Sequence, residues 1–279
     1  MIIGLHHVSL AYSDLELGIR TYSELLGRKP SARSQENGAE CAYFVLANSA
    51  LRIVSPSKES AAAAPIRQML ETKDGVLFEL GFQVEDINRT WQLLSKISLS
   101  SGDVQTFETA DLLHPGGTLR WRTLEFDNRL SHGVNIRFVQ PLTVLPVSKS
   151  FTESPLLRTE LLVIQTGDPE RALGLYAARF HLKLLFDRTN VDTGNRLVQL
   201  ACGDLLLELS HSGVKNSPSK PDHIWGIGWS VAHAEAAQAR LSNTGRNVSS
   251  VKDGAQPGTR VFTIRDGTCG VPTLVVEHI

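Results

Sequence analysis

The chain has 279 residues, of which 42 % are hydrophobic and 20 % charged, so it is long enough for two domains that each bury a core. Its formal net charge of −1 gives no electrostatic reason to expect nucleic acid or an anionic membrane as a partner. The three cysteines are widely separated, which argues against a disulfide framework or a zinc site. With no signal-like start and no apolar run of about 18 residues, we expect a cytoplasmic protein.

The chain begins with an alternating stretch, HHVSLAYSD, that predicts a strand. Strict alternation places His7 on the inward face with Ser9 and puts His6 on the opposite face, where a structural role is expected. An amphipathic helix follows up to Gly27, with Ser13 or Asp14 as its N-cap and the glycine in the left-handed position that ends it. The next two strands are predicted in AECAYFVLA and ALRIVSP.

The same order of elements recurs three more times. The repeats begin with ELGFQVED, LLVIQTGD and GIGWSVAH, and the helix of the third unit has Pro169 at its first position. Two strand candidates follow each helix, and the closing strands GVNIRFVQ and GVPTLVVE match each other in residue type. We therefore predict an α+β fold of four β-α-β-β-β units.

These units pair into two domains. The N-terminal domain spans residues 1–142, with units at 1–57 and 77–142. A linker rich in Pro, Ser and Thr spans 143–156. The C-terminal domain spans 157–279, with units at 157–212 and 222–279.

Paired units that open with HHVSLAYSDLE and YSELLG resemble the vicinal oxygen chelate superfamily, which includes glyoxalase I, methylmalonyl-CoA epimerase, bleomycin-resistance proteins and extradiol dioxygenases. The strand GGTLRWRTLEF is also similar to the second unit of glyoxalase-like domains. The resemblance covers essentially the whole chain and implies two U-shaped sheets, each forming a cup around a ligand. It implies no single reaction, because the superfold hosts isomerases, lyases, oxygenases and pure binders.

The resemblance also implies a divalent metal in the cup, held by His, Glu or Gln on the first and last strands of each unit. In the first cup these positions carry His7, Arg52, Glu79 and Arg137. His7 and Glu79 would be the ligands if a metal is bound, but a guanidinium group has no acceptor and repels a cation. We therefore expect no cofactor, with a divalent metal site that includes an unrecognised third donor as a minor alternative.

In the second cup the matching positions carry Leu161, Glu208, Gly226 and Leu274, and three of these four have no donor side chain. This argues against an extradiol dioxygenase, whose iron lies in the second domain. Trp225 and Trp229 share strand parity, and they serve either as packing or as an aromatic ligand wall.

The sequence is compatible with two functions. The first is a glyoxalase-like enzyme of lyase or isomerase type that acts on a small anionic metabolite in the N-terminal cup. There His7 or Glu79 moves a proton, and Arg52 and Arg137 hold a carboxylate or a developing oxyanion. Arg120 and Arg122 share one face of their strand and would enlarge the positive surface.

The second function is a non-catalytic protein that sequesters a small molecule, like the bleomycin-resistance proteins. In a third interpretation, Glu79 and the two arginines form a buried ion-pair cluster that satisfies only itself. The expected partner is a small anionic molecule, and the chain is either a monomer or a homodimer.

Overall fold

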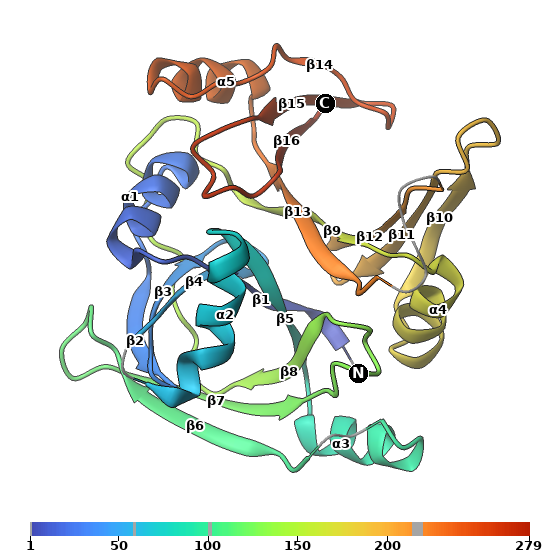
Figure 1. The fold of residues 1–279 in the computed structure, drawn as a ribbon. Helices are drawn as coiled ribbons and strands as arrows, with labels where there is room; N and C mark the ends of the chain where they lie inside the picture. Colours follow the sequence, from blue (N-terminus) through green and yellow to red (C-terminus); the bar gives the residue numbers. More distant parts are fainter. Residues whose placement is uncertain (1, 58–59, 100–101, 214–219) are drawn as a thin grey trace.

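The computed structural model describes residues 2–57, 60–99, 102–213 and 220–279, and within them the chain forms two eight-stranded sheets (Figure 1). The first unit consists of β1 (Ile2–Ala11), α1 (Leu15–Leu26), β2 (Ala32–Glu36), β3 (Ala39–Val45) and β4 (Ala50–Pro56). The second consists of β5 (Val76–Val84), α3 (Ile87–Lys96), β6 (Gln105–Ala110), β7 (Thr118–Glu125) and β8 (Asn135–Pro141). Their strands form one sheet in the order β2-β3-β4-β1-β5-β8-β7-β6.

The third and fourth units repeat this arrangement, with the sheet order β10-β11-β12-β9-β13-β16-β15-β14. The third consists of β9 (Arg158–Gln165), α4 (Pro169–Leu173), η2 (Gly174–Arg179), β10 (Lys183–Thr189), β11 (Arg196–Cys202) and β12 (Leu205–His211). The fourth consists of β13 (His223–Ser230), α5 (Ala234–Asn243), β14 (Lys252–Asp253), β15 (Thr259–Ile264) and β16 (Thr273–His278). The predicted α+β fold of four β-α-β-β-β units is therefore confirmed.

Local chemistry explains where the helices begin and end. The Asp14 side chain caps α1 by accepting a hydrogen bond from the backbone N–H of Leu17, and Gly27 ends the helix at φ 70°. Asp168 caps α4 in the same way, and Pro169 is its first residue, as predicted. The third-unit helix then continues as the π-helical segment η2.

The predicted units contain three strands after each helix, but only two of them were located in each unit, and the strands directly after the helices were not. These strands are β2, β6, β10 and β14, and each lies at an edge of its sheet. All seven residues of β10 are exposed, so this strand carries no alternation of buried and exposed side chains for a pattern to detect. The short helices η1 (Ala61–Ala63) and α2 (Ala64–Thr72) between the first two units were also not predicted.

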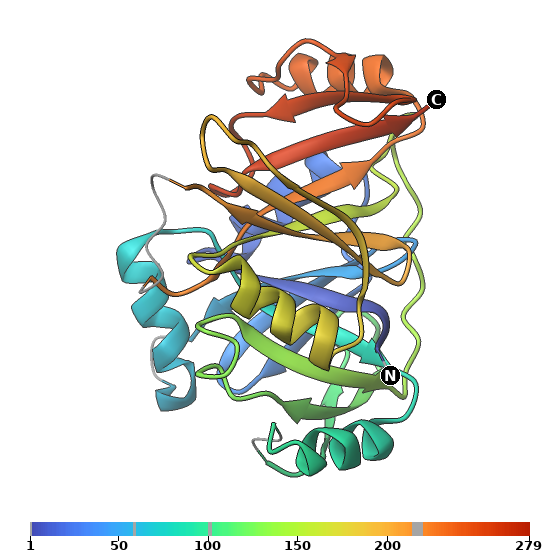
Figure 2. The same cartoon turned by 90° about the vertical axis from the view of Figure 1, so that its right-hand side faces the viewer.

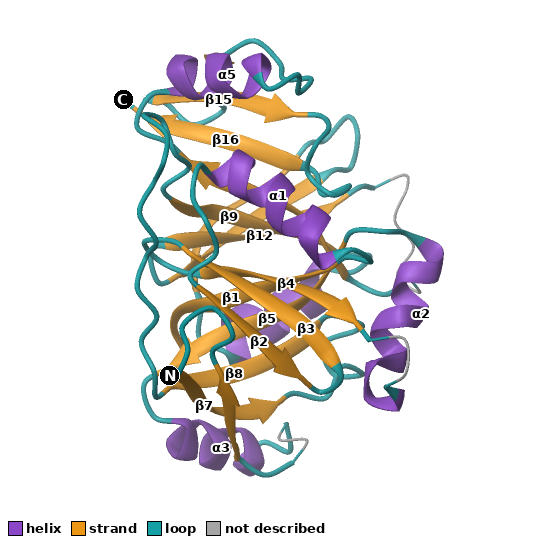
Figure 3. Ribbon diagram, turned by 90° about the vertical axis from the view of Figure 1, so that its left-hand side faces the viewer, coloured by secondary structure: helices purple, strands orange, loops and turns teal. Residues whose placement is uncertain are grey.

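One hydrophobic core contains residues of both sheets. Phe180, which follows η2, packs against three phenylalanines of the first domain, with ring centroids 6.0 Å from Phe82, 5.2 Å from Phe126 and 5.4 Å from Phe138. On the other side, the Tyr22 hydroxyl of α1 donates to the backbone carbonyl of Thr268. Figure 3 shows α1 lying between the first sheet and β16. The helices of one domain thus help to bury the sheet of the other.

The first cup is closed at its rim. The edge strands β2 and β6 approach each other, with Thr109 Oγ1 donating to the Gln35 carbonyl at 3.2 Å and Leu112 N–H to the Arg33 carbonyl at 2.8 Å. The segment 142–157, which joins β8 to β9 and which we call the strap, runs along one side of both sheets (Figure 2). In the part of the chain that the structure describes, none of the helices has the length and apolarity to span a bilayer.

Candidate functional site

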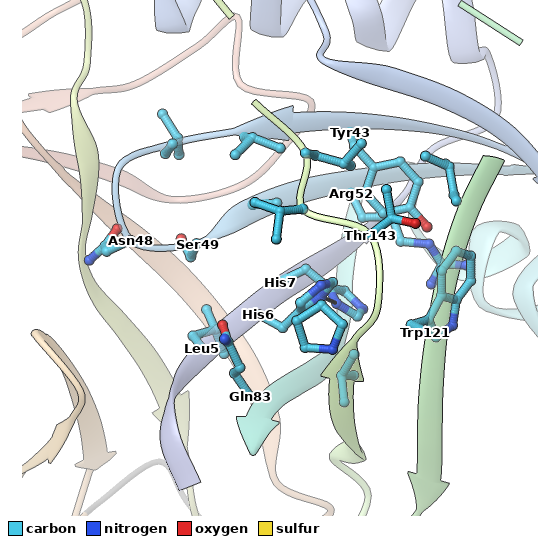
Figure 4. A pocket seen from close by; sticks show the side chains of 18 of the residues that line it. Leu5, His6, His7, Tyr43, Asn48, Ser49, Arg52, Gln83, Trp121 and Thr143 are labelled. Atoms are coloured by element: carbon cyan, nitrogen blue, oxygen red, sulfur yellow. Dashed lines mark hydrogen bonds between the residues drawn. The ribbon is translucent and has the colours of Figure 1, made fainter. Parts of the chain in front are cut away.

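The first cup encloses a cavity of about 420 Å³ that opens among β1, β4, β7 and the strap (Figure 4). One part of its wall is apolar and includes Leu5, Val45, Leu119, Trp121, Val139 and Leu145. The other part is polar and includes His6, His7, Glu36, Tyr43, Arg52 and Arg137. The cavity therefore offers both a hydrophobic surface and a cluster of charged and polar groups.

The four residues aligned as family positions in the first cup do converge. Glu79 lies at the centre, with its Oε1 3.1 Å from His7 Nε2 and 3.1 Å from Arg52 Nη1, and its Oε2 3.3 Å from Arg137 Nη2. The strand register brings them together, because Arg52 and Glu79 both pair with Ser9, while His7 and Arg137 both pair with Gly81.

Glu79 is almost completely buried, with 6 % of its surface exposed, and it is not among the residues that line the cavity. Burial by itself would raise the pKa of this carboxyl, but Arg137, the hydrogen bond from His7 and Arg52 outweigh it and hold the pKa well below its usual range. Ser9 Oγ also donates to the carboxylate, at 3.0 Å. Glu79 is thus a fixed anion behind the cavity wall, and it lies where it can orient other groups rather than touch a ligand.

Arg52 has a second acidic partner that the sequence analysis missed. Its Nη2 lies 2.8 Å from Glu36 Oε2, and the Tyr43 hydroxyl donates to the other oxygen of Glu36 at 2.6 Å. Burial alone would raise the pKa of Glu36, but Arg52, Ser34 and Tyr43 lower it. Glu36 lies at the end of the unpredicted strand β2, so no pattern in the sequence pointed to it. Both terminal nitrogens of Arg52 are thus paired with buried carboxylates, and its Nε is buried without a hydrogen bond in the described part of the chain.

Arg137 is less completely paired. Its Nη2 is shared between Glu79 and Glu125, which accepts at 3.1 Å and whose side chain is 72 % exposed. Its Nε is buried and makes no hydrogen bond within the described part of the chain. Because the Glu125 carboxylate is exposed, its pairing with Arg137 is weak. Arg52 shares the unpaired Nε, but both of its carboxylate partners are buried, so Arg137 is the guanidinium group of this cluster that a ligand reaches by displacing an exposed partner.

The placement predicted for His6 is wrong. Leu5 pairs with Phe82 and His7 with Gly81, so β1 carries one extra residue at His6. This β-bulge breaks the alternation and turns both imidazoles toward the cavity. Figure 4 shows the two rings side by side, and their Nδ1 atoms are 2.8 Å apart.

Both histidine rings are held in their neutral forms. Desolvation in the cup, the proximity of His7 and that of Arg52 lower the pKa of His6 to about 3. Burial also lowers the pKa of His7, against the opposing effect of the hydrogen bond to Glu79. At neutral pH the cluster therefore contains two carboxylates, two guanidinium groups and two uncharged imidazoles.

The two arginines of β7 do not form part of this cluster. Arg120 lines the cavity, but its guanidinium group is exposed and pairs with Glu108 on β6 at 3.0 Å. Arg122 does not line the cavity and donates instead to Asn88 on α3 at 2.7 Å. Because side chains alternate along a strand, it is Leu119 and Trp121 that contribute the apolar wall. Arg122 thus lies outside the cavity lining, and a role of either arginine in ligand binding stays a prediction.

The donor set of the first cup does not fit a divalent metal. Two of the four positions hold guanidinium groups, and the Glu79 carboxylate already accepts from four side chains. Within the described ranges, no group of three His, Cys, Asp or Glu side chains is placed to hold a metal ion. A metal would have to displace both arginines from Glu79.

The strands of the second cup pair in the same register as those of the first, but the corresponding positions carry different residue types. Leu161 pairs with Gly228 as His7 pairs with Gly81, and Leu274 takes the place of Arg137. Its hollow is lined by Glu160, Gln199 and His278 among others, and Glu160 pairs with His278 at 2.7 Å. Burial raises the pKa of Glu208, which accepts from Gln199 at 3.1 Å.

Gly81 is required by the position of His7. A Cβ atom built at Gly81 would lie 2.4 Å from His7 Cε1 and 2.5 Å from its Nδ1. We expect Gly81→Ala to displace the His7 ring from Glu79 and to lower the free energy of unfolding by about 1–3 kcal/mol, as other overpacked substitutions do. Urea denaturation checks this, with Gly174→Ala as the control, because a Cβ atom at Gly174 meets nothing within 4 Å. Equal stabilities of the two variants would contradict it.

Comparisons with known proteins agree with this architecture. A model of the glyoxalase-like domain matches residues 5–178, and a model of the glyoxalase/bleomycin resistance protein/dioxygenase superfamily matches residues 158–271. A search of curated proteins returned no match.

Among solved structures, the chain is similar to a mutant of 4-hydroxymandelate synthase from Streptomyces coelicolor, with TM-score 0.74, 10 % identity, and coverage of 100 % of this chain and 93 % of that one. It is also similar to the Mn(II)-bound glyoxalase from Novosphingobium aromaticivorans, with TM-score 0.66, 8 % identity, and coverage of 99 % and 82 %. At these identities the likeness concerns the fold. Because the first family model spans more than half of the sequence, the chain belongs to the glyoxalase-like domain family of the vicinal oxygen chelate superfamily.

Proposed function

We propose that the protein is an enzyme of lyase or isomerase type that moves a proton on a small carboxylate-bearing molecule in the N-terminal cup. The observation that carries this proposal is that neutral imidazoles, an incompletely paired arginine and an apolar wall share one enclosed cavity. An imidazole transfers the proton, and a guanidinium group stabilises the anion that forms.

The ligand's carboxylate binds at Arg137 and takes the place of Glu125. An arginine binds a carboxylate with two parallel hydrogen bonds, and a hydrogen bond to a charged group contributes about 1.5–3 kcal/mol. The ligand's hydrocarbon part packs against Trp121 and the neighbouring aliphatic side chains. The ligand class is therefore an oxo acid with a hydrophobic aliphatic or aromatic group, whose acidic C–H bond lies next to its carbonyl.

Binding is tested with a panel of 2-oxo and 3-oxo acids that carry aliphatic or aromatic groups, using ligand-induced thermal stabilisation. We expect Arg137→Gln to weaken binding of the stabilising acids by about 10- to 100-fold, because one charge-assisted interaction is lost. Glu125→Gln is the control and should leave binding unchanged or improve it. If no acid stabilises the protein, or if Arg137→Gln binds as tightly as the wild type, the carboxylate site is wrong.

A non-catalytic binding protein is the second candidate, and one observation favours it. Glu79, one of the two acid–base candidates from the sequence, lies behind the wall with its pKa held low, so it carries no proton near neutral pH.

The enzyme and the binding protein differ in whether the ligand is turned over. Solvent deuterium entering the CH2 group of phenylpyruvate, followed by NMR, measures proton transfer without knowledge of the natural product. Stabilisation by the acid without accelerated exchange would favour the binding protein.

A further inference from the structure

The two neighbouring histidines of β1 are not equivalent. His7 Nε2 lies 3.1 Å from Glu79 Oε1, and an ionised carboxylate is an acceptor only, so His7 must donate through Nε2. A neutral imidazole has a single N–H group, which leaves the Nδ1 of His7 as an acceptor. His6 Nδ1, 2.8 Å away, must therefore be the donor in that contact.

This chain of hydrogen bonds determines the tautomer of His6. With its proton on Nδ1, His6 carries a bare lone pair on Nε2, and Nε2 has no hydrogen-bond partner among the residues that the structure describes. His7, in contrast, uses both ring nitrogens, one toward Glu79 and one toward His6. Of the two imidazoles that line the cavity, only that of His6 has a nitrogen free to accept a proton from a bound molecule.

We infer that His6 is the catalytic residue that exchanges a proton with the bound oxo acid, and that His7 and Glu79 are positioning residues that hold it in the Nδ1–H tautomer. This inference rests on the proposed function of the same cup. It assigns the acid–base role to His6, the residue in the β-bulge, in place of His7. The arrangement resembles a carboxylate–imidazole pair that orients a catalytic group, with a second imidazole added at its end.

The step balances within the site. His6 Nε2 takes the proton from the carbon next to the carbonyl, and the electron pair of that C–H bond remains on the ligand as an enolate near Arg137. His6 is then protonated at both nitrogens, and it shares its Nδ1 proton with His7, whose own proton moves toward Glu79. Return of the proton from Nε2 to the same or a neighbouring ligand atom completes an exchange or an isomerisation without a co-reactant.

The charge on the His6 ring depends on the bound ligand. In the empty cup, desolvation, His7 and Arg52 disfavour the protonated ring, and Glu79 favours it. A bound carboxylate near Arg137 adds negative charge to the cup and raises the proton affinity of the ring. His6 is therefore neutral in the empty cup and becomes a stronger base when an anionic ligand is present.

The tautomers are measured directly by NMR of the full chain labelled with 15N-histidine. We expect the His6 ring to be protonated at Nδ1 and the His7 ring at Nε2, with assignments taken from the spectra of His6→Gln and His7→Gln. In His7→Phe, which cannot accept the hydrogen bond, His6 should shift toward the Nε2–H form, whereas the exposed His223 should be unchanged. A wild-type His6 protonated at Nε2 would overturn the inference.

Deuterium exchange into phenylpyruvate tests the catalytic assignment. We expect His6→Gln to reduce kcat by at least 100-fold with little change in KM, and His223→Gln to have no effect. His7→Phe should reduce kcat together with its shift of His6 toward the Nε2–H form, a change that a purely structural role would not produce. If exchange survives in His6→Gln, the assignment fails while the proposed function stands. If the wild type does not accelerate exchange, both fail.

Discussion

Replacing Glu79 by glutamine should lower the free energy of unfolding by about 3–5 kcal/mol, the usual cost of removing one partner from a buried ion pair. Its carboxylate accepts from His7, Ser9, Arg52 and Arg137, and the substitution leaves the buried Arg52 and the partly buried Arg137 without their shared counter-charge. Urea denaturation at pH 7.5 gives the difference from the wild type.

The control for this prediction is Glu125→Gln. Glu125 pairs with the same Arg137, but its side chain is 72 % exposed, and exposed pairs contribute about 0–1 kcal/mol. If Glu79→Gln and Glu125→Gln are equally stable, the buried cluster does not stabilise the domain, and the central position of Glu79 has no energetic consequence.

Acidification should destabilise the protein well before its carboxylates begin to titrate. The pKa of His6 is lowered from 6.5 to about 3 in the folded state, so below pH 6.5 the unfolded chain binds a proton that the folded chain does not. Stability is therefore complete above pH 6.5 and is lost as the pH falls. For His6 alone the loss reaches about 2 kcal/mol by pH 5, and the lowered pKa of His7 acts in the same direction.

This is measured as the difference in unfolding free energy between pH 7.5 and pH 5. His6→Gln should lose about 2 kcal/mol less than the wild type over that interval, because glutamine does not titrate. His223→Gln, at an exposed position, should follow the wild type. The lowered pKa of Glu79 stabilises the folded state, and this stabilisation is lost only below the ordinary pKa of 4.5, outside this window. A wild-type stability that is constant from pH 7.5 to pH 5 would refute the prediction.

Much of the fold followed from local patterns. The helix that starts after Asp14 and ends at Gly27 has its capping chemistry in the sequence, as does the one that starts at Pro169. The closing strands were recognisable because their buried faces alternate. The edge strands β2, β6, β10 and β14 were not recognised, because a strand with few buried neighbours needs no periodic hydrophobic residues.

At two positions, alternation along a strand predicted the wrong side-chain orientation, and the physical reason is the same. The extra residue at His6 shifts the pairing of β1 with β5, and an extra residue at Trp225 shifts the pairing of β13 with β9. Consequently His6 lines the cavity, while Trp225 is 48 % exposed and Trp229 is completely buried. A bulge depends on the partner strand, so alternation within one strand does not reveal it.

By itself, the sequence determined the fourfold repeat and the presence of His7, Arg52, Glu79 and Arg137 at equivalent positions. Only the tertiary structure decided what each of them faces: Glu79 and Arg52 form a buried cluster with Glu36, while Arg137 shares its Nη2 with the exposed Glu125 and His6 lines the cavity beside them. The reason is that residue type and spacing specify which groups meet on a sheet, whereas the partners that satisfy them come from strands far apart in the chain. Whether a polar group is already paired depends on those distant neighbours.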